Sequence, residues 1–413
     1  MPVVGGSPAG AGGSARGVLE GDFERAGSLY VHVPFCFHKC HYCDFYSFVD
    51  TQDRQEAFVA ALELELAALA GHAGQLRTIF VGGGTPSLLK PDLWRRLLAT
   101  MGEMFDLSEI RAGRGEFTVE CNPETVTAEL MGILRAGGVD RVSVGAQSFD
   151  ERHLRTLERW HDPANVQKAL ALAAEAGIAR RSIDLIYGIP GQTMAEWRRD
   201  VETALSMSPG IEHLSCYALT YEANTAMTMR LKKGEFTPCD EDLEADMYEW
   251  LVERLRAEGM ERYEVSNFAR SGGPGAESRH NLAYWRQESW LAAGPSASGH
   301  VRCADPRNGG VRWKNVPRLT DWMEGVTRSG GYAPVVDVET PDPARARRER
   351  IMMGLRLREG LDGREVAGLE RAVEAERAIG LVVVEGGRVR LTDKGFLQAD
   401  GVARGLMGAV SEG

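Results

Sequence analysis

From residue 28 onward, short apolar runs alternate with longer amphipathic stretches. The short runs have the length and β-branched content of strands, and the longer stretches repeat apolar residues every three or four positions, as helices do. Six such units precede residue 240, so the pattern predicts a chain of βα units. The predicted strands are residues 28–35, 78–84, 116–122, 141–148, 182–189 and 213–219.

The predicted strands are apolar along most of their length, which is typical of a parallel sheet buried on both faces. Right-handed crossovers then leave either a barrel or a doubly wound sheet. Most of these strands end in polar or otherwise unusual residues, and barrels of βα units build their site at the carboxyl ends of the strands. We therefore expect an α/β fold with a partial (β/α)6 barrel of the TIM type.

The pattern changes after residue 240. A long amphipathic helix is predicted for 240–259, followed by a glycine-rich, less regular region to about 340. The last 70 or so residues predict helix, helix, hairpin and helix, which suggests a small winged-helix-like domain. It has no concentrated basic recognition helix, so we interpret it as a lid or packing domain. The expected organisation is a flexible leader (1–27), the barrel (28–240), a barrel-extending region (241–340) and the C-terminal domain (341–413).

Composition narrows the class of protein. A chain of 413 residues that is 43% hydrophobic can bury one large core and a small second one. A formal charge of −11 argues against a nucleic-acid surface. No apolar run approaches the roughly 20 residues of a membrane span, and the leader has no hydrophobic core of a signal peptide. We expect a soluble, cytoplasmic protein.

Three cysteines carry the strongest chemical signal. Cys36, Cys40 and Cys43 have the spacing C-x3-C-x2-C directly after the first predicted strand. Three thiolates can hold three irons of a four-iron cluster and leave the fourth iron open. A structural zinc site is less well supported, because it needs a fourth ligand and only His38 and His41 lie within this loop. Disulfides suit secreted proteins rather than this one.

Two further groups of residues fall at strand ends. The run VGGGTPS (81–87) lets the backbone approach a ligand closely, although alone it also fits a tight βα turn; it matches neither G-x-G-x-x-G nor a Walker loop. Glu120, Gln147, Arg159 and Asp184 offer carboxylates, an amide and a guanidinium, which suit the hydroxyl and carboxylate groups of a nucleoside and amino-acid ligand. A lone carboxylate in the strand SIDLIYGI is costly to bury unpaired, which favours a ligand contact for Asp184.

Taken together, the cysteine loop, GGGTP, VECNPE, SVGAQSF and IDLIYGIPGQT resemble the radical S-adenosyl-L-methionine (SAM) superfamily, in the branch of the oxygen-independent coproporphyrinogen III oxidase. The resemblance implies a [4Fe-4S] cluster on Cys36, Cys40 and Cys43, with SAM on the fourth iron and a 5′-deoxyadenosyl radical as product of its reduction. It places the SAM contacts by motif position on Tyr30, Tyr42, Gly83, Gly84, Thr85, Glu120, Gln147, Arg159, Asp184 and Ala218.

The chain departs from the oxidase at two places, and at both it resembles the heme chaperone branch, the HemW type. Phe45 stands where the oxidase has a fourth cysteine, and the leader is glycine-rich. The branch's H-N-x-x-Y-W signature is present as HNLAYW (280–285). His280 could ligate heme iron, with Tyr284 and Trp285 as flat surfaces for the macrocycle. By itself the signature also fits a histidine satisfied in a core. Relatives carry a histidine where this chain has Ser298, and His300 follows two residues later.

The sequence thus predicts a protein that binds heme and passes it to an acceptor protein, with the cluster and exchangeable SAM assisting. The alternative is an enzyme, an oxygen-independent coproporphyrinogen III oxidase that decarboxylates its substrate by radical chemistry. The expected partners are heme, an acceptor protein and a reductant such as flavodoxin or ferredoxin. We expect no nucleic acid, and membrane contact only through the acceptor.

Overall fold

The computed structural model describes residues 13–271 and 275–410. Its centre is a run of six parallel strands whose neighbours pair in sequence order, and each lies within four or five residues of its predicted bounds. The strands are β1 (Ala26–Val33), β2 (Ala73–Gly83), β3 (Glu116–Cys121), β4 (Arg141–Gln147), β5 (Arg180–Tyr187) and β6 (His213–Ala218).

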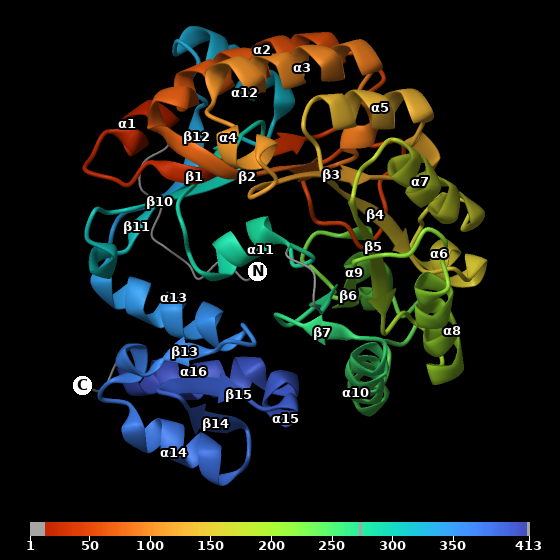
Figure 1. Cartoon of the computed structure of the whole chain (residues 1–413), viewed down its shortest axis with the longest axis vertical. Helices are drawn as coiled ribbons and strands as arrows, with labels where there is room; N and C mark the ends of the chain where they lie inside the picture. Colours follow the sequence, from red (N-terminus) through yellow and green to blue (C-terminus); the bar gives the residue numbers. More distant parts are fainter. Residues whose placement is uncertain (1–12, 272–274, 411–413) are drawn as a thin grey trace.

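Helices cover the convex face of this sheet, as Figure 1 shows for α2, α3, α5, α7 and α8 along its upper and right-hand side. Apolar strand residues that point outward, such as Leu29 and Val31, pack against these helices in one large core. The helices and turns between the parallel strands are α2 (Gln55–Leu69), η1 (Ala70–His72), η2 (Pro86–Leu88), α3 (Pro91–Met104), α4 (Ser108–Arg111), η3 (Pro123–Thr125), α5 (Ala128–Ala136), α6 (Glu151–Thr156), α7 (Ala164–Glu175) and α8 (Met194–Leu205).

The opposite face of the sheet is polar. On β1, Ser28, Tyr30 and His32 alternate with the core residues; the hydroxyl of Thr78 on β2 donates to Ser28, and Ser143 on β4 donates to Asp184 on β5. The prediction was a sheet buried on both faces; the inner-face residues Ser28 and His32 are buried, but they are polar rather than apolar. The inner face encloses a polar interior, which is what a partial barrel around a polar ligand requires.

The region after β6 extends the sheet at both ends into twelve strands, in the order β12-β11-β10-β9-β1-β2-β3-β4-β5-β6-β8-β7. Only β9 among the additions runs parallel to its neighbour β1; the others pair antiparallel. The elements of this region are α9 (Ala226–Lys232), α10 (Glu241–Ala257), β7 (Met260–Arg262), β8 (Asn267–Arg270), α11 (Arg279–Trp285), β9 (Trp290–Ala293), β10 (Ser298–Arg302), η4 (Pro306–Asn308), β11 (Gly310–Asn315), α12 (Leu319–Arg328) and β12 (Val335–Glu339).

The C-terminal part folds as a small three-stranded sheet with helices, at the bottom of Figure 1. Its elements are α13 (Pro343–Leu355), β13 (Leu361–Asp362), η5 (Gly363–Val366), α14 (Glu370–Ala378), β14 (Val382–Glu385), β15 (Arg388–Leu391), α15 (Asp393–Leu397) and α16 (Ala399–Val410). The β14–β15 hairpin turns at the expected EGGR segment. This order confirms the partial barrel with a winged-helix-like C-terminal domain.

The N-terminal segment differs from the expected flexible leader. Residues 13–27 include the helix α1 (Ala15–Leu19), whose Ala15 and Leu19 are buried. The amide of Ala15 donates to the carbonyl of Ala333, and the backbone of Phe23 forms an isolated antiparallel β-bridge with that of Cys303. This segment is held by residues that are distant in the sequence. Its glycine and alanine content alone does not indicate such contacts. The rest of the leader, residues 1–12, lies outside the described residues.

Candidate functional site

The cysteine loop follows the carboxyl end of β1 and is closed by its own backbone. The amide of Cys36 donates to the carbonyl of Phe48 (3.0 Å), and the amide of Phe48 donates to the carbonyl of Pro34 (3.0 Å). Within the loop, Lys39 Nζ donates to the carbonyl of Phe45 and to the hydroxyl of Ser47. These hydrogen bonds fix the backbone of the loop that carries the three cysteines.

The three thiols are free. In the part of the chain that the structure describes, no set of three cysteine sulfurs lies within 4.8 Å of one another. A single tetrahedral zinc ion needs its ligands closer than that, whereas each corner of a polynuclear cluster binds a separate iron. Burial raises the pKa of Cys43 to about 11, so the thiolate needs a cation beside it. The residues therefore fit an iron–sulfur cluster better than zinc.

Neighbouring elements hold the loop from two sides. The amide of His41 donates to the carbonyl of Leu157 (3.2 Å), and the amide of Met227 on α9 donates to the carbonyl of His41 (2.8 Å). Tyr42 packs against a separate small core of Leu157, Ile186, Ile189, Leu219 and Met227. The loop is thus fixed by segments that follow β4 and β6.

Arg159 lies between the loop and the barrel. Its Nη2 donates to the carbonyl of Gly145 at 3.0 Å, and its Nη1 lies 3.8 Å from the sulfur of Cys40. The buried Nε has no hydrogen-bond partner among the described residues. An unpaired buried donor costs free energy unless a ligand accepts from it. Arg159 therefore offers a free N–H to an anionic group next to the cysteines.

The glycine run packs against the cysteine loop rather than pointing its amides at open space. The amides of Gly84 and Thr85 donate to the carbonyls of Val33 and Phe35, both at 2.7 Å, and Thr85 Oγ1 donates to Cys36 Sγ at 3.6 Å. A Cβ on Gly84 would lie 2.7 Å from the carbonyl oxygen of Phe35. Gly83 has φ +106°, where a side chain would strike the ring of His32. Glycine here permits close packing of two site loops.

Two carboxylates lie in the barrel interior below these loops. Glu120 on β3 accepts from the amide of Gly83 (3.0 Å), and Asp184 on β5 accepts from the hydroxyl of Ser143 (2.9 Å). Burial raises the pKa of Glu120 to about 7, helped by the charge of Asp184, and raises the pKa of Asp184 to about 6. Both groups therefore titrate near neutrality and can accept or donate hydrogen bonds to hydroxyl groups of a ligand.

The other expected contacts fall at the same end of the barrel. Gln147 ends β4 in a left-handed conformation (φ +63°), and Ala218 ends β6. Tyr30 lies deeper, with its hydroxyl 2.9 Å from His32 Nδ1. The fold thus brings the cysteine loop, the glycine run and residues from five strands to one face.

The sequence pattern did not point to two residues of the barrel interior, His32 and Tyr217. His32 is buried behind the glycine run, with Nε2 bonded to the carbonyl of Tyr46 (2.8 Å) and its pKa lowered to about 4 by burial. Tyr217 on β6 leaves 42% of its surface exposed, an unusual value for an aromatic side chain on a central strand. The signal that could have found both is their alternation with core residues on β1 and β6.

The HNLAYW segment forms α11, at the amino end of the barrel strands and away from the cysteine loop. Its first turn is held by Glu116, the first residue of β3, which accepts from the amides of Arg279 (2.9 Å) and His280 (3.2 Å). Buried Arg141 pairs with the same carboxylate at 3.1 Å. The helix therefore closes the barrel at the end opposite to the cysteines.

His280 is fully buried, and both of its ring nitrogens have partners. Nδ1 lies 2.8 Å from Thr78 Oγ1, and Nε2 lies 2.9 Å from the hydroxyl of Tyr284. Its ring stacks on Phe80 with centroids 5.3 Å apart. The expectation of His280 as an iron ligand finds no support in this arrangement, because neither nitrogen is free or accessible. The histidine is satisfied in the core.

His300, the second histidine considered for heme, is also buried. Ser298 and His300 lie on β10, which pairs with β9 and β11. Ser298 is exposed, while His300 is buried with its ring 5.0 Å from that of Trp290. Burial and the charge of Arg312 lower the pKa of His300 to about 3. Neither residue lies at the carboxyl ends of β1 to β6, where the cysteines are.

Comparison with known proteins accounts for this arrangement. The radical SAM superfamily matches residues 30–204, and the HemN C-terminal domain matches residues 342–397. The heme chaperone HemW of Mycobacterium tuberculosis is 38% identical over 387 residues, which cover 92% of this chain and 94% of that protein. The chain belongs to the HemW family. The HemW of Bacillus subtilis is 33% identical and is covered over 99% of its length.

The HemW family shares its fold with a solved enzyme. Coproporphyrinogen III oxidase (HemN) from Escherichia coli superposes with a TM-score of 0.77 at 22% identity, covering 93% of this chain and 90% of that one. This similarity shows the fold, including the C-terminal domain. No helix in the described ranges is both long and apolar enough to cross a membrane.

Proposed function

We propose that this member of the HemW family binds heme and transfers it to an acceptor protein. The observation that carries the proposal is the 38% identity over nearly the whole chain to a protein named heme chaperone HemW. The exposed Phe45 in the cysteine loop agrees with it, because the oxidase branch has a fourth cysteine at that place.

In this proposal Cys36, Cys40 and Cys43 hold a [4Fe-4S] cluster, and SAM lies between the cluster and the barrel interior. The free Nε of Arg159 and the carboxylates of Glu120 and Asp184 support this, because SAM carries a carboxylate and ribose hydroxyls. When bound and reduced, the cluster supplies an electron to the sulfonium of SAM. The protein's own contribution is to orient SAM and to keep water from it.

The remaining partners follow from this role. A reductant such as flavodoxin or ferredoxin would supply the electron, and an acceptor protein would take the heme. A cytoplasmic location, with membrane contact only through the acceptor, stays a prediction.

One preparation tests the proposal against the oxidase alternative. The protein is reconstituted anaerobically with iron and sulfide, titrated with heme, and assayed for turnover of coproporphyrinogen III. Stoichiometric heme binding without turnover, followed by heme transfer to an apo-acceptor, is the expected result. Turnover accompanied by weak heme binding would overturn the chaperone function in favour of the enzyme.

A further inference from the structure

One face of helix α11 packs into the barrel, and the other borders a cavity. His280 and Tyr284, one turn apart, point into the barrel. Arg279, Leu282, Ala283 and Arg286 share the other face, since their spacing of three, four and seven residues puts them on one side of a helix. This second face borders a cavity of about 600 Å³ at the amino end of the barrel, which also touches β8 and the start of the C-terminal domain.

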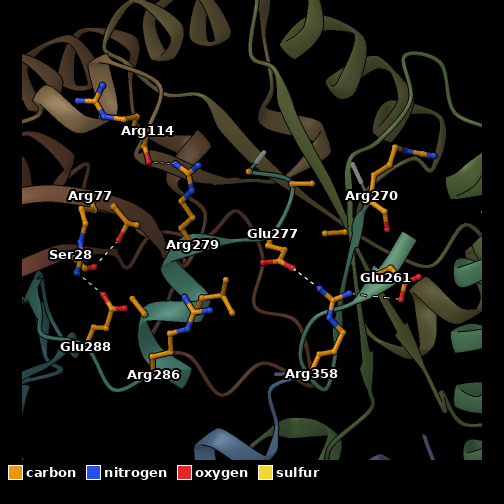
Figure 2. A pocket seen from close by; sticks show the side chains of 17 residues that line it. Ser28, Arg77, Arg114, Glu261, Arg270, Glu277, Arg279, Arg286, Glu288 and Arg358 are labelled. Atoms are coloured by element: carbon orange, nitrogen blue, oxygen red, sulfur yellow. Dashed lines mark hydrogen bonds and ion pairs between the residues drawn. The ribbon is translucent and has the colours of Figure 1, made fainter. Parts of the chain in front are cut away.

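Although the chain has a formal charge of −11, arginines predominate among the charged residues that line the cavity. Figure 2 shows arginines and glutamates around it, and the arginines outnumber the glutamates by six to three. The arginines are Arg77, Arg114, Arg270, Arg279, Arg286 and Arg358. Such an excess of guanidinium groups around one hollow favours an anionic ligand.

Two of these six arginines, Arg270 and Arg279, lack a carboxylate partner among the described residues. Arg270 donates to the carbonyl of Glu258 (3.2 Å), and Arg279 donates to the carbonyl of Gly115 (2.7 Å); neither has an ion pair among the described residues. The other four form ion pairs: Arg77 with Glu288, Arg114 with Glu109, Arg286 with Glu359, and Arg358 with Glu277 and Glu261. The charges of Arg270 and Arg279 therefore remain available to a ligand.

The cavity also has an apolar side. Leu282, Ala269 and Ala283 line it and are buried. Leu282 and Ala269 belong to a small core, separate from the main one, together with Tyr263 and Leu357. Trp285 packs against the same small core. A ligand in the cavity would meet apolar surface on one side and guanidinium groups on the other.

We infer that this cavity receives the two carboxylates of heme, with the edge of the macrocycle against the apolar side. The inference rests on the proposed function and adds to it a place and a mode of recognition. Arginine suits this role because its planar fork of N–H donors matches a carboxylate. The volume lies within the range of about 300–1,000 Å³ typical of ligand pockets. None of the described residues that line the cavity is a histidine, so in this proposal recognition depends on the carboxylates rather than on a histidine bound to iron.

The test combines protein and ligand variants in the full-length chain. Arg270→Gln, Arg286→Gln and Arg358→Gln are combined, because these side chains are exposed and Arg279 is left to hold α11 in place. The matched control combines Arg307→Gln, Arg318→Gln and Arg364→Gln, which are 85%, 76% and 90% exposed and lie outside the cavity. Each protein is titrated with heme and with heme dimethyl ester, whose carboxylates are blocked.

The cavity variant should bind heme at least tenfold more weakly than the unaltered protein, while the control changes less than twofold. The dimethyl ester should bind the unaltered protein at least tenfold more weakly than heme does. Its affinity should be the same for the unaltered protein and for the cavity variant. Equal binding of heme by the unaltered protein and a folded cavity variant would overturn the cavity assignment alone. Absence of heme binding by the unaltered protein would overturn the proposed function itself.

Discussion

The guanidinium of Arg159 lies 3.8 Å from the sulfur of Cys40 and links the segment after α6 to the cysteine loop. Its other amino group donates to the carbonyl of Gly145 on β4. One side chain therefore joins the proposed cluster ligands to the barrel interior, while its unpaired Nε can serve an anionic ligand.

Replacing Arg159 with glutamine should weaken SAM binding about tenfold or more, because a hydrogen bond to a charged group contributes about 1.5–3 kcal/mol. Iron content after reconstitution should change little, since the cysteines remain. The measurement is SAM affinity of the reconstituted protein, with Arg155→Gln, an exposed arginine on α6, as control. Unchanged SAM affinity in the Arg159 variant would remove this residue from the site.

Replacing Cys40 with serine should abolish the visible absorption of a [4Fe-4S] cluster, because a serine oxygen is a poorer ligand for iron than a thiolate. Cys303→Ser is the control, since Cys303 lies outside the cysteine loop and its backbone forms an isolated β-bridge with Phe23. Iron and sulfide analysis checks both proteins. A full cluster in the Cys40 variant would contradict the ligand assignment.

The interior carboxylates predict a pH dependence of SAM binding. Burial gives Asp184 a pKa of about 6 and Glu120 a pKa of about 7, so lowering the pH from 8 to 5 protonates both and removes their negative charge. Affinity for SAM should fall over this interval, and the combined Glu120→Gln and Asp184→Asn variant should show weak, nearly pH-independent binding. The control Glu129→Gln alters an exposed carboxylate and should keep the normal profile. A flat profile in the unaltered protein would count against these contacts.

Glu116 predicts a pH-dependent contribution to stability. Burial alone would raise its pKa, but the guanidinium of Arg141 and the amide of Arg279 hold it at about 2, below the ordinary 4.5. A carboxyl group with a lowered folded-state pKa stabilises the protein above the unfolded-state pKa. That contribution, roughly 3 kcal/mol, is lost as the pH falls from about 5 towards 2.

The test compares urea unfolding of the unaltered protein and Glu116→Gln at several pH values. At pH 7 the variant should be less stable by about 3–5 kcal/mol, because it leaves Arg141 buried without its charge partner. The difference should shrink towards acid pH. Glu151→Gln, on an exposed surface, should change stability by less than about 0.5 kcal/mol. A difference that does not vary with pH would show that the charge of Glu116 is not what stabilises α11.

His280→Ala should lower stability by about 2–4 kcal/mol, because it removes two buried hydrogen bonds and leaves a cavity beside Phe80. Heme stoichiometry at a temperature where the variant is folded should be unchanged. Unfolding curves and heme titration of the same sample check both statements. Loss of heme binding in a variant of normal stability would restore His280 as an iron ligand.

Local regularity made most of the fold predictable. The six parallel strands lie close to their predicted bounds, and the helices α2, α3, α5, α7 and α8 lie between them as the predicted alternation requires, because periodic burial shows in neighbouring residues. The cysteine loop was predictable for a similar reason, since all three ligands lie within eight residues. The gathering of the strand-end residues followed from the parallel topology, which brings carboxyl ends of strands to one face.

What the sequence by itself determined was therefore the element order and the end of the barrel where the strand-end residues gather, and it singled out the three cysteines that we propose as cluster ligands. The tertiary structure alone decided what each side chain contacts. It gave His280 two buried partners from β2 and α11, turned Arg279 and Arg286 towards a cavity, and fixed α1 against the chain near Ala333. The contacts of Thr78 with His280 and of Ala15 with Ala333 join residues that are 200 or more positions apart in the chain. A pattern read along the chain records which face a residue occupies, but not which distant residue lies opposite that face.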